Sequence, residues 1–183
     1  MKKILIGTHN VGKFKEITYL MSKKIKKVSP ISLKIKSPRE TGKTFVENAK
    51  LKANYFSKFT HLPVISDDSG LCIKSLNNKP GIYSARWAKK YGSFHQAMKI
   101  ILKKIKDKRD RSAFFICSLS FKDSRGKVTT VIGKINGSIS HKIVGVNGFG
   151  YEWSKFDQSV LLDEELLNRF EEYFSVFPWE DLK

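Results

Sequence analysis

The chain has 183 residues, a size at which one domain buries a core of its own. Hydrophobic residues make up 40% of it, which excludes a mainly disordered chain. No apolar run approaches the roughly 18–20 residues that cross a bilayer, and the apolar stretch after Lys2 and Lys3 ends too early for a signal peptide. We therefore expect one domain over residues 1–183, located in the cytoplasm and without a membrane partner.

The net charge of +18 comes from 35 Lys and Arg against 17 Asp and Glu. Such a charge favours polyanionic partners, nucleic acid among them. The basic residues are scattered lysines, however, and no pattern of an RNA-recognition motif, a KH domain or a zinc finger is present. Specific nucleic-acid binding is therefore not expected, although a basic nucleic-acid-binding module stays an alternative. A basic surface would also attract a small polyphosphate.

The spacing of apolar residues predicts an alternating order of strands and helices. In chain order, the predictions are a strand over 3–7, a helix over 11–22 with Asn10 as N-cap, a strand over 31–35, a helix over 42–59, a strand, an acidic turn and a second strand over 62–76, a helix over 93–107, a hairpin of strands 112–121 and 127–136, and a helix over 163–174. These elements predict one mixed α/β domain.

The loop between the first strand and the first helix nearly matches a phosphate-binding P-loop. Gly7, Gly12 and Lys13 have the spacing of that motif, but Phe14 stands where Ser or Thr should hold Mg²⁺. Backbone N–H groups at a helix N-terminus form an anion site in any case. The loop is thus either a plain strand–turn–helix connection or a phosphate site whose metal ion is held by other residues.

Acidic residues that could hold such a metal ion occur at two places. Glu40 precedes the long predicted helix, and Asp67 and Asp68 follow a buried apolar run. Mg²⁺ prefers carboxylate oxygens together with water and phosphate. An Asx turn would need only one aspartate, whereas a cation between these loops accounts for both.

Five motifs, in order, resemble the inosine/xanthosine triphosphate pyrophosphatase family, whose enzymes remove nonstandard purine nucleotides from the nucleotide pool. They are THNVGKFKEI, ETGKTFVENAKLKA, DDSGL, PGIYSARWA and GFGY, and the resemblance runs over residues 1–151. The resemblance implies a Mg²⁺-dependent hydrolase that converts dITP, ITP or XTP to the monophosphate and pyrophosphate. It also implies a central mixed sheet flanked by helices, an active site in a cleft between two lobes, and a homodimer.

The same resemblance implies roles for individual residues. Asp68 would accept the proton of the attacking water, and Glu40, Asp68 and Asp67 would lie at Mg²⁺. The implied substrate-binding residues are Thr8, His9, Asn10, Val11, Gly12, Lys13, Asn48, Lys52, Ser69, Arg86, Phe149, Gly150, Tyr151 and Glu152. Asn48 and Lys52, one helical turn apart, could instead form a hydrogen bond at the edge of the core, and Arg86 could instead brace its own loop.

The sequence departs from the family after Tyr151. Glu152 replaces an aspartate, and the late lysine and Ser-His-Arg motif of the family, which contact phosphate and base, have no counterpart. His141 precedes GFGY instead of following it and is expected to be an ordinary surface residue. We therefore expect weaker discrimination between purine bases. A nucleotide-binding relative with weakened catalysis is a second interpretation.

Overall fold

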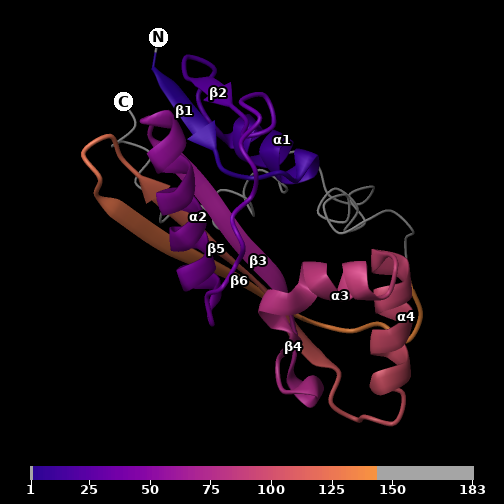
Figure 1. Ribbon diagram of the computed structural model, residues 1–183. Helices are drawn as coiled ribbons and strands as arrows, with labels where there is room; N and C mark the ends of the chain where they lie inside the picture. Colours follow the sequence, from indigo (N-terminus) through magenta and orange to yellow (C-terminus); the bar gives the residue numbers. More distant parts are fainter. Residues whose placement is uncertain (1, 144–183) are drawn as a thin grey trace.

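The computed structural model describes residues 2–143. Its elements are, in order, β1 (Lys3–Ile6), α1 (Val11–Leu20), β2 (Lys26–Val28), α2 (Phe45–Thr60), β3 (Val64–Ile73), the 3₁₀ turn η1 (Lys74–Leu76), β4 (Lys79–Pro80), the 3₁₀ turn η2 (Gly81–Tyr83), α3 (Ser84–Lys90), α4 (Phe94–Lys104), β5 (Ser112–Lys122) and β6 (Val128–Ser138). Figure 1 shows α3 and α4 at the far end of the long strands from β1 and β2.

The strands form one mixed sheet in the order β2-β1-β3-β5-β6, with β4 beside β3. The pairs β2–β1 and β1–β3 are parallel, whereas β3–β5 and β5–β6 are antiparallel. β3 lies between β1 and β5, so part of this ten-residue strand has a neighbouring strand on both edges. The expected mixed α/β fold with helices around a central sheet is confirmed.

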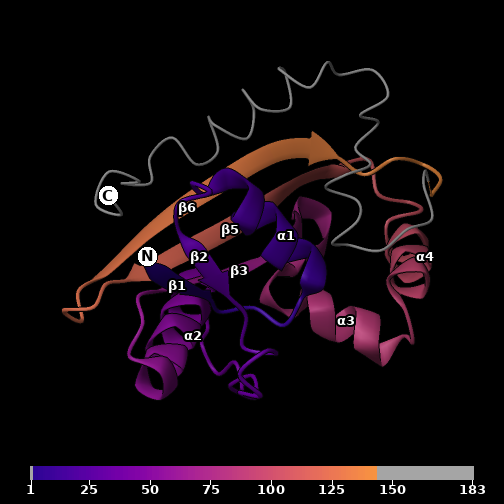
Figure 2. The same cartoon turned by 90° about the horizontal axis from the view of Figure 1, so that it is seen from above.

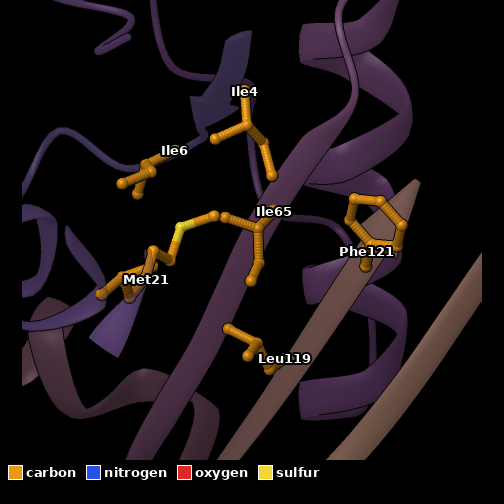
Figure 3. Close-up of a cluster of buried hydrophobic side chains, with 7 residues drawn as sticks. Ile4, Ile6, Met21, Ile65, Leu119 and Phe121 are labelled. Carbon is orange, nitrogen blue, oxygen red and sulfur yellow. The ribbon is translucent and has the colours of Figure 1, made fainter. Parts of the chain in front are cut away.

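The two faces of the sheet carry separate apolar clusters, because successive side chains of a strand point to opposite sides. On one face, Ile17 of α1 and Met21, the C-cap residue of that helix, pack against strand residues that include Ile65, the cluster drawn in Figure 3. On the other face, Ala53 and Phe56 of α2 pack against Leu5 and Val64. Figure 2 accordingly shows α1 and α2 separated by the strands.

Two helix starts follow from capping residues. Asn10 caps α1 by accepting a hydrogen bond from the Lys13 backbone N–H, as predicted. Thr44 caps α2 by accepting from the Glu47 backbone N–H, and the Glu47 carboxylate accepts from the Lys43 N–H. Both helices therefore begin at fixed residues beside the polar loops that precede them.

Two predictions of secondary structure are wrong. Residues 31–35 form a turn, not a strand: Ile31 and Leu33 are exposed, only Ile35 packs on the α2-side cluster, and the strand beside β1 lies earlier, at Lys26–Val28. The predicted acidic turn within 62–76 is also wrong, because β3 runs unbroken through both aspartates.

The remaining predictions agree with the structure within a few residues, and the helix predicted over 163–174 lies outside the described residues. None of the helices among residues 2–143 is long and apolar enough to cross a membrane.

Candidate active site

The first helical turn of α1 places Lys13 against the middle of β3. The Lys13 Nζ donates to Asp67 Oδ2 and to Ser69 Oγ, each at 2.5 Å. Asp67 and Ser69 are two residues apart on one strand, so their side chains share the face that α1 covers. Phe14 packs against the apolar cluster on that face. The residue that departs from the P-loop pattern is therefore a partly buried packing residue at the edge of the core.

Burial and ion pairing act in opposite directions on this pair. Burial alone would raise the pKa of the Asp67 carboxyl, but the Lys13 and Lys52 ammonium groups outweigh it, and the pKa is lowered. Burial alone would likewise lower the pKa of Lys13, and Asp67 reverses this shift and raises it. Both side chains, the Lys13 ammonium group and the Asp67 carboxylate, are therefore charged at neutral pH.

Asp68 lies on the opposite face of β3, under α2. Its Oδ2 accepts a hydrogen bond from Asn48 Nδ2 at 3.0 Å, and its Oδ1 lies 3.5 Å from Lys52 Nζ. Lys52 Nζ also donates to Glu40 Oε1 at 2.9 Å. Asn48 and Lys52 therefore belong to a polar group with Asp68 and Glu40, and contact of either side chain with substrate stays a prediction.

The environment of Asp68 differs from that of its neighbour. Burial raises the pKa of the Asp68 carboxyl, and the nearby Glu40 carboxylate adds to the rise, while Lys52 and the Asn48 hydrogen bond reduce it. Two consecutive aspartates thus have pKa values shifted in opposite directions. Such divergence is typical of sites where one carboxyl fixes a charge and another exchanges a proton.

A close approach of the chain beside Gly70 brings Arg86 to the site. A side chain at Gly70 would meet the Gly81 carbonyl, and the Ser84 hydroxyl joins that carbonyl to the Leu71 backbone N–H. α3 starts at this contact, and Arg86 Nη2 donates to the Glu40 carbonyl at 2.7 Å. The glycine of DDSG is therefore required by packing rather than by a turn.

The carboxylates of Glu40 and Asp68 fit a magnesium ion in their chemistry. They come from different segments, and both contact one ammonium group, Lys52 Nζ, so a cation is already favoured between them. Asp67, by contrast, is bonded to Lys13 on the other face. Within residues 2–143, no group of three or more His, Cys, Asp or Glu side chains is placed to hold a metal ion. Two carboxylates leave positions for water and phosphate.

The other residues of the opening loop divide into two groups. Thr8 and Asn10 lie at the N-terminus of α1, where Thr8 Oγ1 accepts from the Asn10 N–H, and Val11 is 58% exposed. The His9 ring turns away from α1: its Nε2 contacts the Ile35 carbonyl and its Nδ1 contacts Ser37 Oγ. A contact of the His9 side chain with substrate stays a prediction.

The site contains one titratable residue that sequence reasoning missed. Burial raises the pKa of Glu16, one turn after Lys13 on α1, to about 7, and Asp67 adds to the rise. A glutamate three residues after a phosphate-binding lysine could have been identified from helical spacing alone.

The model of the Ham1 family matches residues 4–165. The chain belongs to the Ham1 family. A dITP/XTP pyrophosphatase of Legionella pneumophila (strain Paris) is 39% identical over 156 residues, covering 83% of this chain and 80% of the relative. One from Gluconobacter oxydans is 35% identical over 82% of this chain and 73% of the relative.

Solved structures of Ham1 proteins have the same fold. A HAM1 protein from Coxiella burnetii is 35% identical, with a TM-score of 0.74 over 82% of this chain and 79% of that chain. The Ham1 protein of Staphylococcus aureus is 29% identical, with a TM-score of 0.76 over 95% and 98%. The Ham1 match includes the predicted nucleoside contacts Phe149, Gly150, Tyr151 and Glu152, which lie outside the described residues.

Proposed function

We propose that this protein hydrolyses nonstandard purine nucleoside triphosphates, such as dITP, ITP and XTP, to the monophosphate and pyrophosphate. The observation that carries the proposal is the arrangement at the middle of β3, where Lys13 with Asp67 and Lys52 with Asp68 occupy opposite faces. The dITP/XTP pyrophosphatase relatives support the same activity.

In the proposed reaction, water attacks the α-phosphorus of the triphosphate. A bond forms between the water oxygen and the α-phosphorus, and the bond from that phosphorus to the oxygen bridging to the β-phosphorus breaks, so pyrophosphate leaves. Asp68 accepts the proton of the water, and its raised pKa suits a general base. Lys13 and Lys52 offset charge on the phosphates, and the N-terminus of α1 adds backbone N–H donors.

Glu40 and Asp68 are the residues that would hold Mg²⁺. A bound Mg²⁺ would supply electrostatic stabilisation of the charge that develops on the phosphate oxygens. Because Asp67 is bonded to Lys13, we assign it to orienting that lysine instead of to the metal ion. Arg86, which donates to the Glu40 carbonyl and has an exposed side chain, would hold the loop of Glu40 in place.

The homodimer, the cytoplasmic location and the cleft between two lobes stay predictions. The alternatives from the sequence, a nucleotide binder with weak catalysis and a basic nucleic-acid-binding module, are less favoured. Neither accounts for a buried aspartate with a raised pKa beside the Lys52 ammonium group.

The test is pyrophosphate release from inosine, xanthosine, guanosine and adenosine triphosphates, with and without Mg²⁺. We expect pyrophosphate and the monophosphate, strict dependence on Mg²⁺, and a preference for inosine and xanthosine that is smaller than in relatives with the late Ser-His-Arg motif. Release of orthophosphate and a diphosphate would contradict attack at the α-phosphorus. Tight triphosphate binding without turnover would favour the weakened binder.

A further inference from the structure

Glu40 lies in a long connection without helix or strand. The connection runs from the end of β2 at Val28 to the start of α2 at Phe45. On its C-terminal side, the Gly42 N–H donates to Asn48 Oδ1 at 2.8 Å, which ties the chain to α2. Lys52 and Arg86 contact Glu40 itself. Contacts on the N-terminal side of the connection would further reduce the entropy that this segment loses when Glu40 is placed beside Asp68.

His9 provides contacts on that side. Its Nε2 lies 2.9 Å from the Ile35 carbonyl oxygen, and its Nδ1 lies 2.6 Å from Ser37 Oγ. Since a carbonyl only accepts, Nε2 carries the proton, and in the neutral ring Nδ1 accepts from the Ser37 hydroxyl. The two hydrogen bonds thus fix both the tautomer and the plane of the ring.

The apolar side of the same ring anchors it to the core. The His9 ring centroid is 6.0 Å from that of Phe56, which is fully buried in α2, and Ile35 packs against the cluster that contains Phe56. His9 also follows Thr8 directly and precedes Asn10, the N-cap of α1. It therefore joins the phosphate loop, the core under α2 and the connection that carries Glu40.

We propose that His9 is a positioning residue that sets the place of Glu40 relative to the phosphate loop. Ile35 and Ser37, which it holds, come five and three residues before Glu40. With Gly42 held by Asn48 on the other side, Glu40 lies on a short span between two anchors. The activity part of this inference rests on the proposed function; the placement of the loop does not.

Hydrogen exchange tests the placement directly. In His9→Leu, which keeps bulk but removes both hydrogen bonds, the Ile35 and Gly42 amides should exchange about tenfold faster, while amides in the middle of α2 keep their rates. Ser37→Ala should give a smaller rise of about threefold. Ser32→Ala is the matched control, because Ser32 lies in the same connection and, among residues 2–143, its hydroxyl bonds only to the nearby Ser29 carbonyl.

Kinetics test the consequence. In His9→Leu, kcat should fall about tenfold and half-saturation by Mg²⁺ should need about fivefold more ion, while KM at saturating Mg²⁺ stays within about twofold. Binding of Mg²⁺ to the substrate-free protein, measured by calorimetry, should weaken in parallel. His141→Leu, at an exposed histidine, should change none of these values.

The outcomes separate the two proposals. Unchanged Gly42 exchange in a folded His9→Leu variant would refute the positioning role, and so would a rise in KM without a fall in kcat, which would instead make His9 a substrate contact. If His9→Leu does not fold, the same measurements are made on Ser37→Ala, with Ser32→Ala as the control. Lack of pyrophosphate release by the wild type would refute the proposed function and leave the exchange result standing.

Discussion

The two neighbouring aspartates of β3 should respond in opposite ways to the same substitution. Asp67→Asn removes the charge that pairs with Lys13, whereas Asp68→Asn removes a carboxylate whose charged form is disfavoured by burial. We expect Asp67→Asn to lower the free energy of unfolding and Asp68→Asn to leave it unchanged or to raise it slightly. Only Asp68→Asn should remove nearly all activity by removing the group that accepts the proton of the attacking water.

The size of each effect follows from the contacts. Removing one partner of a buried ion pair costs about 3–5 kcal/mol; Lys13 is 23% exposed and keeps its bond to Ser69, so we expect about 1–3 kcal/mol. Asp68→Asn keeps an acceptor for Asn48 Nδ2. The substitution also removes a general base and a carboxylate beside Glu40. We therefore expect kcat to fall by more than the roughly 10²–10⁴-fold that a general base alone typically contributes.

The pH dependence distinguishes the two mechanisms. Because the pKa of Asp67 is lowered in the folded state, its stabilisation is present above the unfolded pKa of about 3.9 and is lost as the pH falls through the folded pKa. The stability difference between wild type and Asp67→Asn should therefore shrink in acid. Because the pKa of Asp68 is raised, the charged carboxyl costs stability at higher pH. The free energy of unfolding of Asp68→Asn should therefore rise relative to that of the wild type as the pH rises.

Urea unfolding at several pH values and pyrophosphate release from ITP measure both effects on the same preparations. More than about a tenth of wild-type activity in Asp68→Asn would refute its role as base, given the expected loss. Equal stability of Asp67→Asn and wild type at pH 7 would refute the importance of the Lys13 pair.

Three further substitutions test other features of the fold. Glu16→Gln should raise the free energy of unfolding by about 1–2 kcal/mol at pH 8 and not at pH 4.5, because the folded pKa of about 7 makes the charged form costly only at higher pH; equal urea midpoints at pH 8 would contradict this. Gly7→Ala should cost about 1–3 kcal/mol, since its Cβ would meet Ser66 Oγ and lie 2.6 Å from Phe56, and thermal unfolding would detect it. Phe14→Ser should lower stability through lost packing without creating orthophosphate release from ATP, so orthophosphate as product would show that the loop works as a P-loop.

Much of this protein could be predicted from local sequence. The N-cap at Asn10, the amphipathic helix after Thr44 and the hairpin of β5 and β6 follow from short-range rules of capping and periodicity, and the structure confirms them. The motifs also predict that Lys13, Lys52 and the aspartates belong to one site, because their order along the chain resembles that of the family, and this assignment stays a prediction.

Other features were decided only by the tertiary structure. The acidic pair resembled a turn because buried charges are costly in a strand, yet β3 continues through it, since α1 and α2 bring a lysine to each face. Residues 31–35 alternate like a strand, but β1 already pairs with Lys26–Val28 at that edge. Sequence spacing brings the two aspartates together; the pleat of β3 separates them and gives each its own partner, and this separation sets their opposite pKa shifts.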